Sequence, residues 1–163
     1  MHTPPKPTEP VDHIELTRCA FGSPMHRAIQ ALRERILLGP TGRTADDFEA
    51  AHPGYERESS HFGALDARQQ VIACVSIRPN HPAAGDGVLN QMAVDETWQG
   101  CGLGRRIAEH ATRWARDEAR LSQLHCSARV TAQLFYERLG WFTEGEVYES
   151  AGLPHVRMVF RFA

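Results

Sequence analysis

The segment from Gly87 to about Ala119 constrains the fold most, because a buried strand, a glycine-rich turn and an amphipathic helix follow one another directly. Residues 87–94 (GVLNQMAV) are mostly apolar, as expected of a central strand that is covered on both faces. After the turn, apolar residues recur at helical spacing, at Leu103, Ile107, Ala111, Trp114 and Ala115. A strand that leads straight into a helix predicts an α/β arrangement.

The remaining apolar patterns predict the elements around this segment. In order, we expect a strand at 12–19, a helix that Ser23 caps and Pro24 begins, a short helix at 44–52, paired strands at 61–66 and 71–78, a strand at 124–128, a helix at 130–139 that Gly140 ends, and closing strands at 143–149 and 155–162. Helices early and strands late, around a central ββαβ order, indicate an α/β (α+β) domain with a mixed sheet flanked by helices.

The chain of 163 residues is long enough for one core. Residues 1–11 carry four prolines and are expected to form a flexible arm, so residues 12–163 are expected to be a single domain. A formal net charge of -2 argues against a nucleic-acid partner. No segment resembles a signal peptide or is apolar enough to span a membrane, so we expect a cytoplasmic protein without a membrane partner.

The cysteines and histidines form no recognisable metal motif. Four cysteines lie far apart without a CxxC pair, and nine histidines include no HExxH spacing. We therefore expect reduced, mostly buried thiols, scattered histidines and no metal cofactor.

The turn at 99–104 (QGCGLG) has the sequence pattern of an anion-binding loop. Three glycines at alternate positions leave backbone N–H groups uncovered, and the start of the following helix adds unpaired donors and a positive dipole end. Such a nest suits a phosphate or a pyrophosphate, to which Arg105 and Arg106 can add charge. A Walker A loop is excluded because no Lys follows, and the dinucleotide fingerprint fails because Arg105 stands where it needs a third glycine. A glycine-rich turn without a ligand remains the alternative.

The motif Gln99-Gly100-x-Gly102-x-Gly104 resembles the Q/RxxGxG/A loop of the GNAT superfamily of N-acetyltransferases, and residues 91–94 resemble the family's fourth strand. The resemblance covers roughly residues 71–160 and implies the GNAT acyl-CoA N-acyltransferase fold with acetyl-CoA as cosubstrate. It also implies a bulged fourth strand whose backbone pairs with the pantetheine arm at Met92 and Val94. The implied cofactor-binding residues are Met92, Ala93, Val94, Gln99, Gly100, Cys101, Gly102, Leu103, Gly104, Arg105 and Ala132.

A second motif, Ala132 to Trp141 (AQLFYERLGW), resembles the family's AxxFYEKLGF signature. In many members the tyrosine at the position of Tyr136 is a general acid beside the coenzyme sulfur, and a phenol can give a proton or a hydrogen bond to a departing thiolate. The alternative is a packing tyrosine on a helix whose apolar side carries Leu134 and Phe135. Arg129 stands where the family often has Asn.

The tail from Glu146 to Met158 is similar to the ElaA-like branch of the family, and Leu32-Arg33 resembles a remnant of that branch's first-helix arginine. As an ordinary helix residue, Arg33 would instead be solvated. The general base stays open between Glu149, His155 and a water molecule. Cys101 lies at a helix start, which lowers a thiol pKa, but its place in the loop indicates a spacer.

The resemblance therefore implies an acetyltransferase in which an amine attacks acetyl-CoA directly. The acceptor is not readable from the sequence, nor is the use of acyl groups other than acetyl, and a homodimer is one assembly that the family suggests. The rival interpretations are a non-catalytic acyl-CoA-binding sensor or scaffold and a nucleotide-binding protein of another fold.

Overall fold

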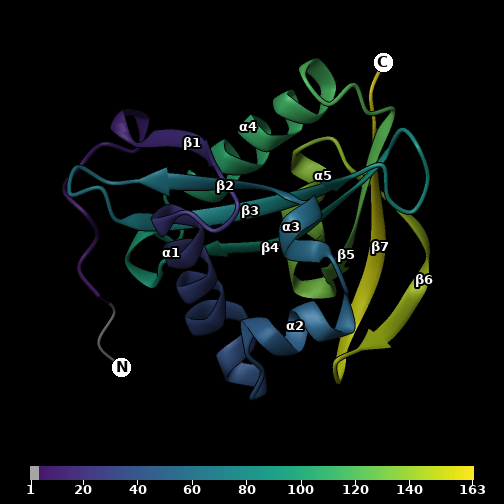
Figure 1. Cartoon of the computed structure of the whole chain (residues 1–163), viewed down its shortest axis with the longest axis horizontal. Coiled ribbons are helices and arrows are strands. Elements are labelled where there is room, and N and C mark those ends of the chain that lie inside the picture. The colour runs from purple at the N-terminus through teal and green to yellow at the C-terminus, as the bar shows by residue number, and fades with distance from the viewer. Residues whose placement is uncertain (1–3) are drawn as a thin grey trace. The chain divides into compact units, whose positions relative to one another are not determined.

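The computed structural model describes residues 4–163, whose strands and helices form a mixed α/β fold (Figure 1). Residues 1–3 of the expected N-terminal arm lie outside the described residues. The strands are β1 Glu15–Cys19, β2 Ser60–Leu65, β3 Val71–Pro79, β4 Asp86–Val94, β5 Gln123–Arg129, β6 Phe142–Ser150 and β7 Leu153–Arg161. The α-helices are α1 Pro24–Arg33, α2 Ala45–Ala51, α3 Tyr55–Glu58, α4 Leu103–Asp117 and α5 Gln133–Arg138.

The strands form one mixed sheet in the order β1-β2-β3-β4-β5-β7-β6. β4 and β5 pair in parallel, whereas β1 with β2, β5 with β7, and β6 with β7 pair antiparallel. The predicted α/β class with a mixed sheet is therefore confirmed. The chain groups into two compact units, one made of the residues up to Ser76 with 91–111, and the other of 77–90 with 112–163.

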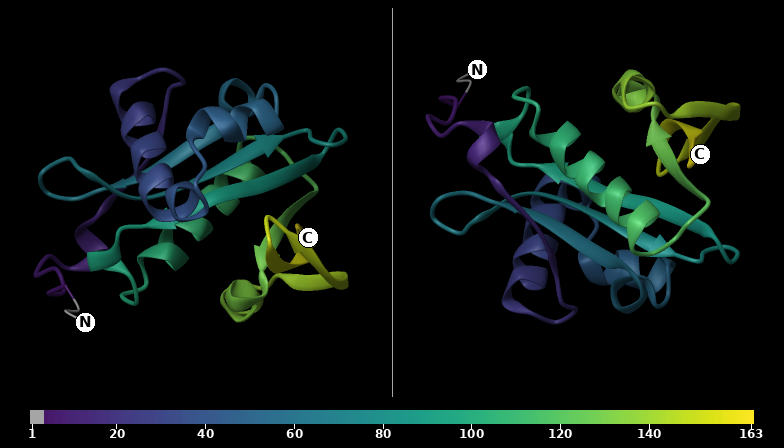
Figure 2. Two further views of the ribbon diagram at one scale, coloured as in Figure 1. Left: turned by 90° about the horizontal axis from the view of Figure 1, so that it is seen from below. Right: turned by 90° about the horizontal axis from the view of Figure 1, so that it is seen from above.

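In the first unit, α1 begins where the sequence predicts. The Ser23 hydroxyl accepts a hydrogen bond from the backbone N–H of His26 at 3.1 Å, and Pro24 occupies the first turn, where its missing N–H costs nothing. Ile29 and Leu32 of α1 pack with Cys74 of β3 and Ala93 of β4. Within this unit, α1 and the first turns of α4 lie on opposite faces of the strands (Figure 2).

The segment after α1 winds as a π-helix over Glu34–Leu38 before α2 begins. Thr44 caps α2 as predicted, in a capping box that Asp47 completes. The four-residue helix α3 was not predicted, because it is too short to show a periodic pattern. Leu38, Phe48 and Tyr55 form the small core beneath these turns.

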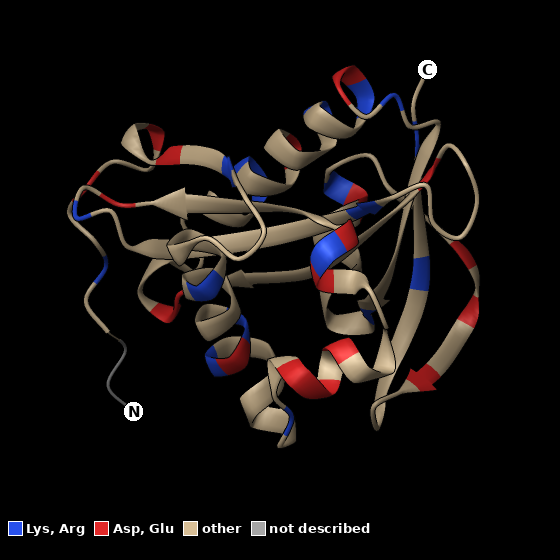
Figure 3. Ribbon diagram, in the orientation of Figure 1, with Lys and Arg blue, Asp and Glu red and all other residues tan. Residues whose placement is uncertain are grey.

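In the second unit, Gly87 allows β4 to lie close to its neighbours, since an added Cβ would meet side-chain atoms of Leu121 at 2.6 Å and of Leu124 at 2.8 Å. Helix α5 has only six residues, and its orientation differs from the expected one. Leu134 is 55% exposed, so its predicted place on an apolar side was wrong, whereas Tyr136 is buried. Acidic residues mark β6 (Figure 3), which is exposed along nearly its whole length.

No helix within residues 4–163 combines the length and the apolar character that a membrane crossing needs.

Candidate functional site

The glycine loop has the backbone geometry of an anion nest. Gly100 and Gly102 have left-handed φ angles of 77° and 88°, and a Cβ at either position would meet no atom within 4 Å. Their peptide groups are thus free of side-chain cover, and they lead directly into the 15-residue helix α4 at Leu103. Gly104 lies inside the first turn of that helix. The loop presents uncovered amides at the positive end of a long helix, which is an arrangement that binds phosphate.

Side chains of the loop hold its shape. The Gln99 amide donates to the carbonyl of Val94 at 2.9 Å, and the Cys101 thiol donates to the carbonyl of Trp98. Asp95 accepts from the backbone N–H of Thr97 and so caps the preceding turn. The thiol of Cys101 thus contacts the loop backbone.

The two arginines after the loop differ in what they contact. Arg105 is exposed and forms a 2.9 Å ion pair with Glu109 one turn along α4, an interaction that costs little to break. Arg106 donates to the backbone carbonyls of Val11 and Ile14. Arg105 is thus the arginine that can turn to an anion at the loop, while Arg106 fastens α4 to the start of the chain.

Strand β4 breaks its regular pattern at Gln91. Gly87, Leu89 and Ala93 are buried, and the other residues of β4 have intermediate exposure. The expectation that this strand is covered on both faces was therefore wrong. Gln91 adopts a left-handed φ of 56°, which is uncommon for a residue with a side chain. This irregularity distorts the strand where the resemblance implies a bulge, next to Met92 and Val94.

Tyr136 is enclosed in the second unit. It is 7% exposed, and its ring centroid lies 5.4 Å from that of Trp141. Burial raises the pKa of the Tyr136 hydroxyl, and Cys126 raises it further. Burial likewise raises the pKa of Cys126 to about 12. Both groups are therefore protonated at neutral pH.

The other predicted residues of the second unit lie in turns or strands near its surface. Ala132 belongs to the 3-10 turn before α5, and Arg129 ends β5. Among the candidate bases, Glu149 is exposed on β6, and His155 of β7 donates through Nδ1 to the carbonyl of Leu153 at 2.8 Å. The second ring nitrogen of His155 is then the acceptor in the neutral ring.

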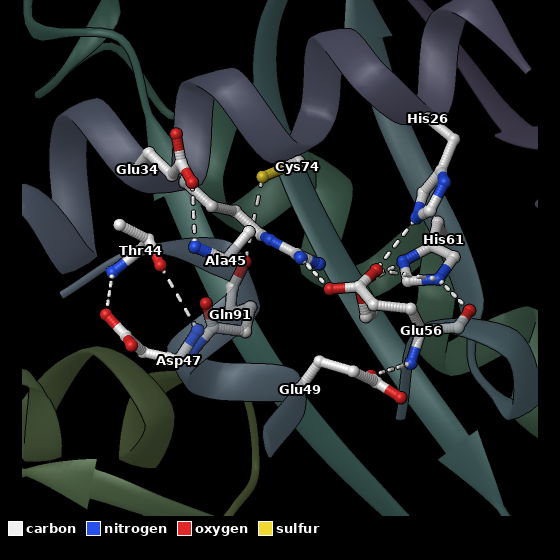
Figure 4. Close-up of polar contacts among 12 residues, drawn as sticks. His26, Glu34, Thr44, Ala45, Asp47, Glu49, Glu56, His61, Cys74 and Gln91 are labelled. Atoms are coloured by element: carbon white, nitrogen blue, oxygen red, sulfur yellow. Dashed lines mark hydrogen bonds and ion pairs between the residues drawn. The ribbon is translucent and has the colours of Figure 1, made fainter. Parts of the chain in front are cut away.

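The first unit also contains a buried ionic network that the sequence did not reveal (Figure 4). Glu56 of α3 accepts from the fully buried guanidinium of Arg33 and lies 2.8 Å from the Nε2 atom of His26. His61 of β2 contacts the backbone carbonyl of Glu56 through Nε2 and the hydroxyl of Ser76 through Nδ1, both at 2.8 Å. The interpretation of Arg33 as a solvated residue was wrong, and the histidines are not all scattered.

Charges inside the network decide its protonation. Burial alone would raise the pKa of Glu56, but the Arg33 charge and the hydrogen bonds from Arg33 and His26 outweigh it, so the pKa lies below its usual value. Burial lowers the pKa of His61 to about 4. A buried carboxylate thus pairs with a buried guanidinium, and His61 is neutral.

Three possible metal ligands converge in this network, namely the side chains of His26, Glu56 and His61. The hydrogen bonds nevertheless place a proton on each Nε2 atom. The Gly22 amide donates to Nδ1 of His26, so its Nε2 carries the proton toward Glu56. Nε2 of His61 faces a carbonyl oxygen, which only accepts. Since a metal needs a free lone pair and Arg33 already neutralises Glu56, these contacts favour a structural network.

Comparison with known protein families identifies the family to which this chain belongs. A family model described as "Acetyltransferase (GNAT) domain" matches residues 44–162. The glycine loop, the distorted fourth strand and strands β2 to β7 of the sheet lie within that match, and the chain belongs to the GNAT acetyltransferase family.

Solved structures agree with this fold. An acyl-CoA N-acyltransferase from Pseudomonas aeruginosa is 20% identical with a TM-score of 0.75, over 90% of this chain and 98% of that one. ElaA from Escherichia coli is 19% identical with a TM-score of 0.73, also over 90% and 98%. A GNAT acetyltransferase from Elizabethkingia anophelis, solved with acetyl-CoA bound, is 15% identical with a TM-score of 0.69, over 93% and 99%.

Proposed function

We propose that the protein binds acetyl-CoA and transfers its acetyl group to an amine. The observation that carries this proposal is the pair of left-handed glycines, Gly100 and Gly102, just before α4. A Cβ added at either glycine would meet no other atom within 4 Å, so there is room for a ligand beside the backbone. The family supplies the ligand class, since the Elizabethkingia anophelis relative was solved with acetyl-CoA. The pyrophosphate is held by the amides of the loop, with Arg105 as a supplementary cation.

The reaction that we propose is a direct displacement. The amine nitrogen attacks the thioester carbonyl, a C–N bond forms, the C–S bond breaks, and the coenzyme leaves as a thiolate. Tyr136 donates a proton to that thiolate, and the proton lost from the amine passes to a base, for which Glu149, His155 and water are the candidates. Met92, Ala93 and Val94 contribute backbone groups to the pantetheine arm, although Gln99 already occupies the carbonyl of Val94.

A cytoplasmic location is part of this proposal. Cys74 and Cys126 are free and buried, as thiols are in reducing compartments.

Calorimetry with coenzyme A, ATP and NAD tests the ligand class, and release of coenzyme A on mixing with an amine panel tests the reaction. We expect binding of coenzyme A in preference to the two nucleotides. Binding without turnover on any amine would instead support a non-catalytic acyl-CoA-binding module, and preference for ATP or NAD would overturn the proposal.

The variant Gly102→Ala tests the loop itself. A Cβ there projects into the space that we assign to phosphate, so we expect coenzyme A affinity to fall at least about tenfold, which corresponds to about 1.4 kcal/mol. Gly42→Ala is the matched control, because Gly42 also has a left-handed φ (74°) and no atom within 4 Å of an added Cβ. It carries the same backbone strain, so an equal affinity loss in both variants would contradict the assignment.

A further inference from the structure

The thiol of Cys74 contacts β4 at its irregular residue, Gln91. Cys74 lies on β3, is completely buried, and has its sulfur 3.6 Å from the carbonyl oxygen of Gln91, to which the thiol donates. The close-up in Figure 4 shows this contact, drawn between Cys74 and Gln91. Gln91 is the residue of β4 with the left-handed φ of 56°. A side chain of one strand therefore holds the backbone of the next strand at its point of distortion.

The distorted backbone needs such a partner. Where a strand bulges, the regular ladder of backbone hydrogen bonds is interrupted, and buried carbonyls need other donors. Backbone pairing with β3 is present just beyond the distortion, where the N–H of Asp95 donates to the carbonyl of Ile72 at 2.8 Å. A left-handed conformation at a residue such as Gln91 persists only where its surroundings fix it.

The chemical state of Cys74 suits it to this task. Burial raises the pKa of the thiol to about 12, against the opposing influence of the Arg33 charge and of a hydrogen bond with the Ala93 backbone. The thiol therefore keeps its proton at neutral pH and remains a donor. Its sulfur contacts the carbonyl of Gln91, and Cys74 packs in one buried cluster with Ala93, so that it meets the residues on either side of Met92.

We propose that Cys74 is a positioning residue for the coenzyme site: its thiol fixes the backbone of β4 from Gln91 to Ala93 and so sets the direction of the Met92 backbone groups that meet the pantetheine arm. This inference rests on the proposed function, because it assumes that the pantetheine arm runs along β4. Cys74 does not react in this role. It acts through the strand that it holds.

Two substitutions of similar size separate positioning from packing. Cys74→Ser keeps a donor and an acceptor, whereas Cys74→Ala removes both and leaves a small void. If the thiol only fills space, serine is the worse replacement, because it buries a hydroxyl among the apolar side chains of Ile29, Leu32 and Ala93. If the thiol positions β4, alanine is the worse replacement for coenzyme binding, whatever the order of thermal stability.

We expect Cys74→Ala to weaken coenzyme A binding about three- to tenfold, the range of one weak hydrogen bond, and Cys74→Ser to recover part of that loss. The same order is expected for KM toward acetyl-CoA, with kcat nearly constant. Cys19→Ala and Cys19→Ser are the controls, because Cys19 packs against the same core cluster and lies on β1. These variants should bind coenzyme A as the unaltered protein does.

Amide hydrogen exchange in the free protein supplies a measurement that needs no ligand. We expect the amides of Met92 and Ala93 to exchange faster in Cys74→Ala than in Cys74→Ser. Equal exchange, or coenzyme binding that is as tight in the alanine variant as in the serine variant, would overturn the positioning role. Failure of the unaltered protein to bind coenzyme A would instead overturn the proposed function, while the exchange order would still decide whether Cys74 holds β4.

Discussion

Tyr136 holds its proton more firmly than a solvated tyrosine does. It is 7% exposed, and its pKa is raised by burial and by the neighbouring Cys126. A general acid of this kind transfers its proton only to a strongly basic group, and a departing thiolate in a water-poor site is such a group. The same burial is also what a packing residue beside Trp141 shows, so the role of Tyr136 has to be tested by turnover.

We expect Tyr136→Phe to lower the turnover number by about 10²–10⁴-fold, the usual loss when a general acid is removed. Coenzyme A affinity should barely change, because the hydroxyl acts mainly in the transition state. Steady-state kinetics with a good acceptor, together with calorimetry, measure both. Tyr55→Phe is the control, since Tyr55 is also buried but belongs to the small core with Leu38 and Phe48 in the first unit. A loss below about twofold in Tyr136→Phe would make Tyr136 a packing residue.

Single residues differ in how far the sequence reveals them. The open glycine turn at Gly100 and Gly102 could be predicted, because alternate glycines leave the backbone before a helix without side-chain cover. Its role in binding a ligand stays a prediction. The left-handed Gln91 and its contact with Cys74 could not, since no local pattern marks a contact between residues 17 positions apart. Arg33 left a signal: Ile29, Leu32 and Arg33 follow one another at helical spacing on the buried face of α1, where a charge needs a buried partner.

At the scale of elements, the buried pair of Arg33 and Glu56 joins α1 to α3. Removing the guanidinium leaves Glu56 buried without its counter-charge, so we expect Arg33→Met to lower the free energy of unfolding by about 3–5 kcal/mol. Arg35→Met is the matched control on the same stretch of chain. Arg35 is 49% exposed where it pairs with Asp95, and an exposed pair contributes about 0–1 kcal/mol.

Urea denaturation at pH 7 compares these two variants. Equal losses of unfolding free energy would show that the buried pair contributes no more than the exposed one. If Arg33→Met does not fold, Glu56→Gln keeps the shape of the side chain and can be measured in its place.

The longest elements followed from periodicity, whereas the shortest α-helix, α3, was missed and α5 was expected with another orientation. Strands β3 and β4 and helix α4 could be predicted, because each has enough residues to show a pattern of burial. The four residues of α3 and the six of α5 show too little of a pattern, and the orientation of Leu134 was accordingly wrong. The network of Glu56 and His61 depends on α3, so it was missed together with that helix.

For the whole molecule, the network predicts a loss of stability in mild acid. The pKa of His61 is about 4 in the folded protein against 6.5 as its ordinary value. Between these values the unfolded chain binds the proton and the folded protein does not, so stability falls as the pH decreases from about 6.5 to about 4. The slope approaches about 1.4 kcal/mol per pH unit, and the total approaches about 3 kcal/mol.

Denaturation at a series of pH values between 7 and 4.5 measures this slope. His61→Gln keeps a donor toward the Glu56 carbonyl but has no titration, so its slope should be smaller. His13→Gln, at an exposed position, should leave the slope unchanged. A slope that is identical in all three proteins would assign the acid sensitivity to other groups, among them Glu56, whose lowered pKa adds stability that disappears only at still lower pH.

Strand β6 is an edge of the sheet at which another molecule could add a strand in a concentrated solution. It is the last strand in the sheet order, and its exposed side chains include Val147 and Tyr148. A free sheet edge of this kind is a template for uncontrolled strand addition between molecules. Glu146 and Glu149 charge this edge, whereas Glu144 pairs with Arg157 and Arg161 of β7. A register shift between Glu144 and Tyr148 bends the strand. We therefore expect the charged and bent edge of β6 to hinder the addition of a strand from another molecule near neutral pH.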